Sequence, residues 1–152
     1  MARLVIAVLG QNAATDLGGE ALLPVQFFRA YRRLGHRAVL FCHERNRENL
    51  RGALSPEEFA EVFFERDTLL QRVSYALQRG APGGLAHGFE LAVRASTERR
   101  QARRLRDLAG RERIDFVHHV TPVSPRAVTF IADVGPPVFH GPLNGNMSFP
   151  PA

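Results

Sequence analysis

Residues 4–42 decide the fold of this chain, with the sequence LVIAVLGQNAATDLGGEALLPVQFFRAYRRLGHRAVLFC. The aliphatic run from Leu4 to Leu9 is typical of a strand buried on both faces of a parallel sheet. From Glu20 to Leu34 the apolar residues recur at helical spacing, and a glycine directly after Leu34 ends the pattern. Ala38 to Cys42 is apolar again. The stretch therefore predicts a strand, a helix and a second parallel strand, joined by a right-handed crossover.

The rest of the chain continues this alternation. A serine, a proline and two glutamates at 55–58 indicate the start of a short helix. Longer helices are predicted at 68–79, 85–108 and 124–133, a loop at 80–88, and further strands at 62–64, 114–120 and 138–140. We expect residues 1–152 to form one Rossmann-like α/β domain, a three-layer α/β/α arrangement with a mainly parallel sheet of about five strands.

Composition and charge limit the class of protein. Apolar residues make up 45% of the chain and charged residues 23%, which is typical of a globular protein and argues against a disordered one. All twenty basic residues are arginines, and the formal net charge of +5 favours anionic partners. The single cysteine cannot form an internal disulfide, so we expect a reducing, cytoplasmic location. No apolar run approaches the length of a membrane span.

A pair of glycines stands where the first helix begins. Gly18, Gly19 and Glu20 follow a polar loop after the first predicted strand. Glycines allow backbone amides to approach a diphosphate closely, and the helix N-terminus stabilises its charge. The turn lacks the spacing of the dinucleotide-binding and P-loop motifs, so an ordinary flexible loop before a helix is the alternative.

Further polar residues follow the later strands. His118 and His119 end the fourth predicted strand, the turn 121–124 comes next, and the glycine-bearing segment 141–146 follows the fifth strand. Because neighbouring strand residues point to opposite faces, the two imidazoles are not expected to bind one metal ion. We expect one to face a ligand crevice and the other to pack beneath a helix, with a purely structural pair as the alternative. The carboxyl edge of the sheet is therefore the predicted binding edge.

The long predicted helix at 85–108 carries six arginines in its second half, at positions 94, 99, 100, 103, 104 and 106. Two interpretations are open. The arginines form a solvated face with ion pairs to Glu98, Asp107 and Glu112, or they contact acidic lipid headgroups at a membrane periphery. No aromatic residues are interleaved with them, so nucleic acid is not an expected partner.

Four segments stand out when taken in order: Leu17-Gly18-Gly19-Glu20, Leu34-Gly35-His36-Arg37, Asp115-Phe116-Val117-His118-His119-Val120 and Gly141-Pro142-Leu143-Asn144-Gly145. Together they resemble the N-terminal half of a family 4 glycosyltransferase with the two-domain GT-B fold. The resemblance covers most of the chain except about residues 45–110, and its most specific part is the last segment.

The resemblance implies a retaining hexosyltransferase-type enzyme that moves a sugar from a nucleotide-sugar to an acceptor, with no metal and no further cofactor. Gly18, Gly19 and Glu20 would then meet the donor diphosphate. Thr121, Asn144, Gly145 and Asn146 would line the acceptor or sugar cleft. Many members carry a functional histidine where this chain has Val120, so His119 is our candidate for the catalytic imidazole.

The resemblance also implies that the donor-binding C-terminal domain lies outside this chain. The chain stops in a loop directly after a predicted strand, so we expect it to be the acceptor-side part of a longer enzyme, inactive by itself. Two alternatives from other classes remain open. One is a non-catalytic Rossmann-like module that binds a nucleotide, a phosphorylated ligand or a partner chain, and the other is a membrane attachment domain that uses the arginine-rich helix.

Overall fold

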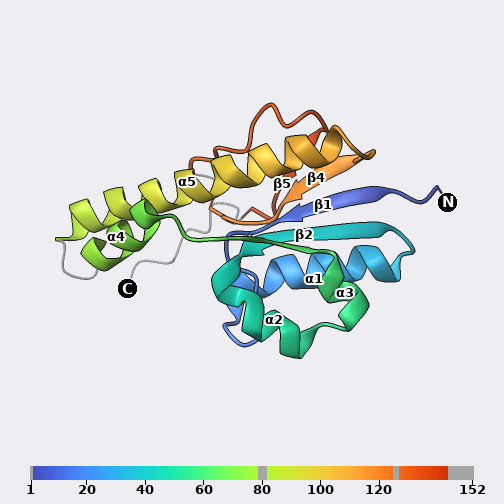
Figure 1. The fold of residues 1–152 in the computed structure, drawn as a ribbon, viewed down its shortest axis with the longest axis horizontal. Helices are drawn as coiled ribbons and strands as arrows, with labels where there is room; N and C mark the ends of the chain where they lie inside the picture. The colour runs from blue at the N-terminus through green and yellow to red at the C-terminus, as the bar shows by residue number, and fades with distance from the viewer. Residues whose placement is uncertain (1, 79–81, 125–126, 144–152) are drawn as a thin grey trace, which may run out of the picture.

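The computed structural model describes residues 2–78, 82–124 and 127–143 and has one five-stranded sheet (Figure 1). The strands are β1 (Val5–Leu9), β2 (Arg37–His43), β3 (Val62–Glu65), β4 (Phe116–His119) and β5 (Val138–His140). Their order is β3-β2-β1-β4-β5, and every neighbouring pair is parallel. The Rossmann-like α/β fold predicted from the sequence is confirmed.

Helices lie on both faces of this sheet. Figure 1 shows α1 (Gly19–Arg33), α2 (Arg47–Ala53) and α3 (Pro56–Ala60) on one side, and α5 (Gly83–Ala109) on the other. A short 3₁₀ helix, η1 (Glu44–Asn46), leads from β2 into α2. Helix α4 (Leu69–Gln78), which follows β3, packs against α5.

The sheet has a hydrophobic core on each face, because the side chains of β1 point alternately to the two faces. Ile6 and Val8 point to one face and pack with Phe28 of α1. Ala7 and Leu9 point to the other face and share a core with Leu105 of α5. Because successive strand residues face opposite sides, an uninterrupted aliphatic strand fits only a sheet that is covered on both faces.

Two parts of the sequence prediction need correction. The predicted helix at 124–133 is wrong, because the described residues 127–133 form no helix. Two of their backbone donors are taken by side chains: Phe130 N–H donates to the Glu98 carboxylate at 2.6 Å, and Ile131 N–H donates to the Thr129 hydroxyl at 3.2 Å. The segment 47–53, which the sequence did not predict to be helical, forms α2 and buries Leu50.

Other boundaries differ by a few residues. α5 begins at Gly83, inside the predicted loop, and β4 is shorter than the predicted strand at 114–120. In the described parts of the chain, no helix has both the length and the apolar character required to cross a membrane.

Candidate functional site

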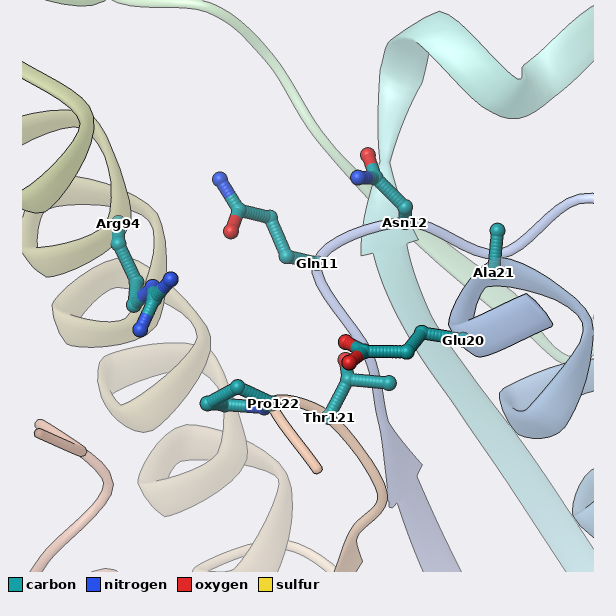
Figure 2. Close-up of a pocket in the computed structure, with 7 residues that line it drawn as sticks. All are labelled: Gln11, Asn12, Glu20, Ala21, Arg94, Thr121 and Pro122. Carbon is teal, nitrogen blue, oxygen red and sulfur yellow. The ribbon is translucent and has the colours of Figure 1, made fainter. Parts of the chain in front are cut away.

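A polar pocket lies at the carboxyl edge of the sheet (Figure 2). It is formed by the loop after β1, the first turn of α1, the residues after β4 and one side chain of α5. Its volume is about 160 Å³, which is less than the roughly 300–1,000 Å³ of a complete ligand pocket, so it encloses only one end of a ligand. The lining residues are Gln11, Asn12, Glu20, Ala21, Arg94, Thr121 and Pro122.

The loop after β1 is held by backbone hydrogen bonds to the neighbouring strand. Gly10 N–H donates to the Phe41 carbonyl at 3.1 Å, and His43 N–H donates to the Gln11 carbonyl at 3.2 Å. Farther along the loop, Thr15 N–H donates to the Asn49 side chain at 2.9 Å. The wall that carries Gln11 is therefore fixed by β2 and α2.

The glycine turn, Gly18 and Gly19, directly precedes the pocket residue Glu20 in the sequence. Gly18 and Gly19 have φ angles of 63° and 52°, in the left-handed region that favours glycine. Both residues are exposed, and no other part of the chain lies within 4 Å of where their Cβ atoms would be. The turn therefore presents backbone at the start of α1, as the proposed diphosphate contact requires, but it does not line the pocket itself.

The pocket combines both charge signs with neutral hydrogen-bonding groups. Figure 2 shows Glu20 and Thr121 on one side of the pocket and the Arg94 guanidinium on the opposite side. The amides of Gln11 and Asn12 complete the polar wall. Such a set accepts and donates hydrogen bonds, which suits a ligand rich in hydroxyl groups.

His119 lies inside the molecule and does not line the pocket. Its Nε2 is 3.8 Å from the Glu98 carboxylate of α5, and its Nδ1 is 3.2 Å from His140 Nδ1. Burial lowers the pKa of His119 to about 3, and burial also raises the pKa of Glu98. The candidate catalytic imidazole is thus a neutral ring in the closed layer between β4 and α5.

His118 is also buried, on the α1 side of the sheet. Its Nε2 lies 2.8 Å from the Gly141 carbonyl, which only accepts hydrogen bonds, so Nε2 carries the proton. Its Nδ1 then accepts from the Tyr31 hydroxyl at 2.9 Å. This imidazole positions the start of the segment after β5. Neither histidine faces the pocket, although the sequence prediction placed one of them there.

The arginines of α5 are used largely within the molecule. Arg100 donates to the Arg66 carbonyl at 2.6 Å, and Arg104 donates to the Phe64 carbonyl at 3.0 Å. Arg106 donates to the Asp133 carbonyl at 3.0 Å. These arginines tie α5 to the end of β3 and to the segment before β5, so they are not simply a solvated surface.

The remaining predicted residues divide into two groups. Thr121 lines the pocket as expected from its place after β4, whereas Asn144, Gly145 and Asn146 lie outside the described residues. Within the described ranges, no three His, Cys, Asp or Glu side chains gather in a way that could hold a metal ion.

Sequence reasoning missed three polar residues of the pocket, Gln11, Asn12 and Arg94, and also Ala21 and Pro122. Gln11 and Asn12 had a usable signal, because they are the first polar residues after a buried parallel strand. Arg94 had none, since nothing in the sequence separates it from the other arginines of its helix. Comparison with protein-family models, curated proteins and solved structures found no match for the chain.

Proposed function

We propose that this chain is the acceptor-side half of a retaining glycosyltransferase and that its pocket holds one end of a hydroxyl-rich ligand. The observation that carries the proposal is the pocket at the carboxyl edge of a parallel sheet, lined by Glu20, Gln11, Asn12 and Thr121. In open α/β sheets this edge is the usual ligand site. The four sequence segments that resemble family 4 glycosyltransferases support the same function.

The Glu20 carboxylate in the pocket favours sugar hydroxyls over phosphate. A carboxylate such as Glu20 accepts hydrogen bonds from hydroxyl groups but repels an anion placed beside it. The donor diphosphate therefore belongs at the exposed backbone of Gly18 and Gly19, outside the pocket. This division moves Glu20 away from the diphosphate contact that the resemblance implied for it. Glu20 and Thr121 then bind hydroxyl groups of the acceptor or of the transferred sugar.

The small volume supports a half-site. A pocket of about 160 Å³ leaves most of a nucleotide-sugar and its acceptor uncovered, so a second lobe is needed to close the cleft. That lobe would hold the nucleotide and supply the groups that stabilise the leaving diphosphate. We therefore expect no sugar transfer by this chain alone.

Two-dimensional NMR of the isotope-labelled chain tests the proposal. Titration with UDP-glucose, GDP-mannose and methyl α-mannoside should shift the amide signals of Gln11, Asn12, Gly18 to Ala21 and Thr121. Glu20→Ala should weaken binding by about tenfold, which is equivalent to the loss of one hydrogen bond to a charged group. Glu57→Ala is the matched control, because Glu57 is also an acid in the first turn of a helix, α3.

The outcome is decisive in either direction. Shifts confined to other faces of the molecule, or equal weakening by both variants, would contradict the proposed site. Sugar transfer by the chain in the absence of any second protein would contradict the half-site.

A second candidate function is favoured by Arg94 in the pocket and by the exposed glycine turn. In that case the chain is a Rossmann-like module that binds a phosphorylated ligand without catalysis. Inorganic pyrophosphate would then shift the same amide signals as the nucleotide-sugars, and Glu20→Ala would strengthen binding by removing a negative charge.

A further inference from the structure

Helix α4 exposes an apolar face. Leu69, Val73 and Leu77 are 78%, 47% and 51% exposed, and their spacing of four residues places them on one side of the helix. Arg72 and Ala76 lie on the same side and are exposed as well. We call these five residues the α4 outer face.

The other side of α4 is attached to α5. Gln71 is 1% exposed, and its amide donates to the Thr97 hydroxyl at 2.7 Å. An amphipathic helix on a globular protein normally buries its apolar face. In α4 three large apolar side chains point to solvent instead, which requires an explanation.

The position of α4 leaves this face accessible. Figure 1 shows α4 beside the first half of α5, beyond the end of the sheet toward which the β1 arrow points. The pocket lies at this same end, since Arg94 of α5 and Thr121 after β4 both line it. Leu85 and Leu91, in the same half of α5, are exposed too.

Charge favours an anionic occupant for the α4 outer face. Helix α4 contains no acidic residue, Arg72 stands in the middle of the face, and the chain carries a net charge of +5. Two copies packed face to face about a two-fold axis would bring Arg72 against Arg72, which opposes self-association. In an acidic lipid bilayer, the acyl chains can surround the leucines and the lipid phosphates can pair with the arginine.

We propose that the α4 outer face binds the surface of an acidic phospholipid bilayer. Leu69, Val73 and Leu77 enter the boundary between headgroups and acyl chains, while the Arg72 side chain extends back to the lipid phosphates. This contact differs from the membrane alternative that the sequence left open for α5, because Arg100, Arg104 and Arg106 of α5 donate to carbonyl groups of the chain. The proposal does not depend on which ligand the pocket binds.

Tryptophan fluorescence tests insertion directly, because the chain has no tryptophan of its own. In Val73→Trp, vesicles of phosphatidylcholine and phosphatidylglycerol in equal amounts should shift the emission to shorter wavelength, and brominated lipids should quench it. Val128→Trp is the matched control, since Val128 is 55% exposed and lies outside α4. Its emission should not change.

Cosedimentation with the same vesicles gives a second readout. Leu77→Glu should reduce binding by about tenfold, whereas Leu34→Glu, the same charge change at an exposed leucine after α1, should not. Binding should also weaken as salt increases and be lost with phosphatidylcholine alone. Circular dichroism of each variant establishes that it is folded.

Three results would overturn the proposal. The first is the absence of a shift in Val73→Trp emission at low salt. The second is equal loss of binding in both glutamate variants. The third is a shift that depends on protein concentration without vesicles, because that behaviour would show that α4 joins two copies of the chain.

Discussion

Gly10 lies so close to Pro24 that a side chain would not fit at this position. It follows β1 directly, and a Cβ atom at this position would lie 2.9 Å from the Cβ of Pro24. Pro24 lies in α1 one turn after Glu20, and its ring cannot move aside as a flexible side chain would. The contact therefore holds the N-terminal half of α1 against the start of the loop that carries Gln11 and Asn12.

We expect Gly10→Ala to lower the free energy of unfolding by about 1–3 kcal/mol, the usual cost of overpacking a buried site. Because the pocket is built on this contact, the variant should also bind sugar ligands more weakly. Urea denaturation measures the first effect and the NMR titration measures the second.

Gly52 supplies the control for this substitution. It lies on the exposed side of α2, with open space where a Cβ atom would lie. Gly52→Ala should leave stability unchanged or raise it by about 0.5–1 kcal/mol, as expected for alanine in a helix. Equal destabilisation by both substitutions would show that Gly10 is not a special packing position.

A series of hydrogen bonds fixes the start of α4 and attaches this helix to α5. Thr68 N–H donates to the Gln71 side-chain oxygen at 2.7 Å, and Gln71 N–H donates to the Thr68 hydroxyl at 3.1 Å. This reciprocal pair is a capping box and fixes where the helix begins. The same Gln71 side chain donates to Thr97, whose hydroxyl donates to the Val93 carbonyl at 3.0 Å.

Thr97→Val should destabilise the α4–α5 junction by about 1–3 kcal/mol, because it leaves the buried Gln71 amide without its acceptor. Thr97→Ser retains the hydroxyl and should cost less. Hydrogen exchange at the α4 amides measures the difference. If the serine variant is the less stable of the two, the lost methyl group matters more than the hydrogen bond, and this explanation of the junction is wrong.

The elements that the sequence predicted well are those whose signal is local. β1, α1 and β2 each carry enough apolar residues at one period to be recognised alone. The segment 124–133 was wrongly predicted because its conformation depends on Glu98, which is 32 residues away from Phe130 in the chain. α2 was missed because a single one of its residues, Leu50, is buried, and one buried position gives no periodic pattern.

The same distinction applies to the candidate site. Glu20 and Thr121 could be named from the sequence because the topology of a parallel sheet brings the ends of β1 and β4 to one edge, and both line the pocket. The ligand groups expected to contact them stay predictions. Arg94 could not be found, since its place at the pocket depends on how far α5 extends beyond the sheet. The burial of His119 likewise results from packing against Glu98, which no pattern in the sequence expresses.

Three buried histidines couple the stability of the molecule to pH. Burial lowers the pKa of His43, of His118 and, to about 3, of His119. The folded chain therefore keeps these rings neutral at pH values where the unfolded chain, with ordinary histidine pKa values near 6.5, binds protons. The free energy of unfolding consequently falls as the pH decreases below about 6.5. The raised pKa values of Glu65 and Glu98 act in the opposite direction at more acidic pH.

Comparison with His119→Gln isolates one of these contributions. Between about pH 6.5 and pH 5, the stability difference between the native chain and the variant should decrease by about 1.4 kcal/mol per pH unit, because one proton is bound on unfolding. Urea denaturation at several pH values measures this difference. A difference that is independent of pH would mean that His119 is not held neutral in the folded chain.

The single cysteine has a practical consequence. Cys42 is fully buried in β2, between β1 and β3, and burial raises its pKa to about 12. A thiol reagent therefore modifies it only from conformations in which the middle of the sheet has separated. The rate of alkylation thus reports how often the sheet opens under native conditions, without any added label.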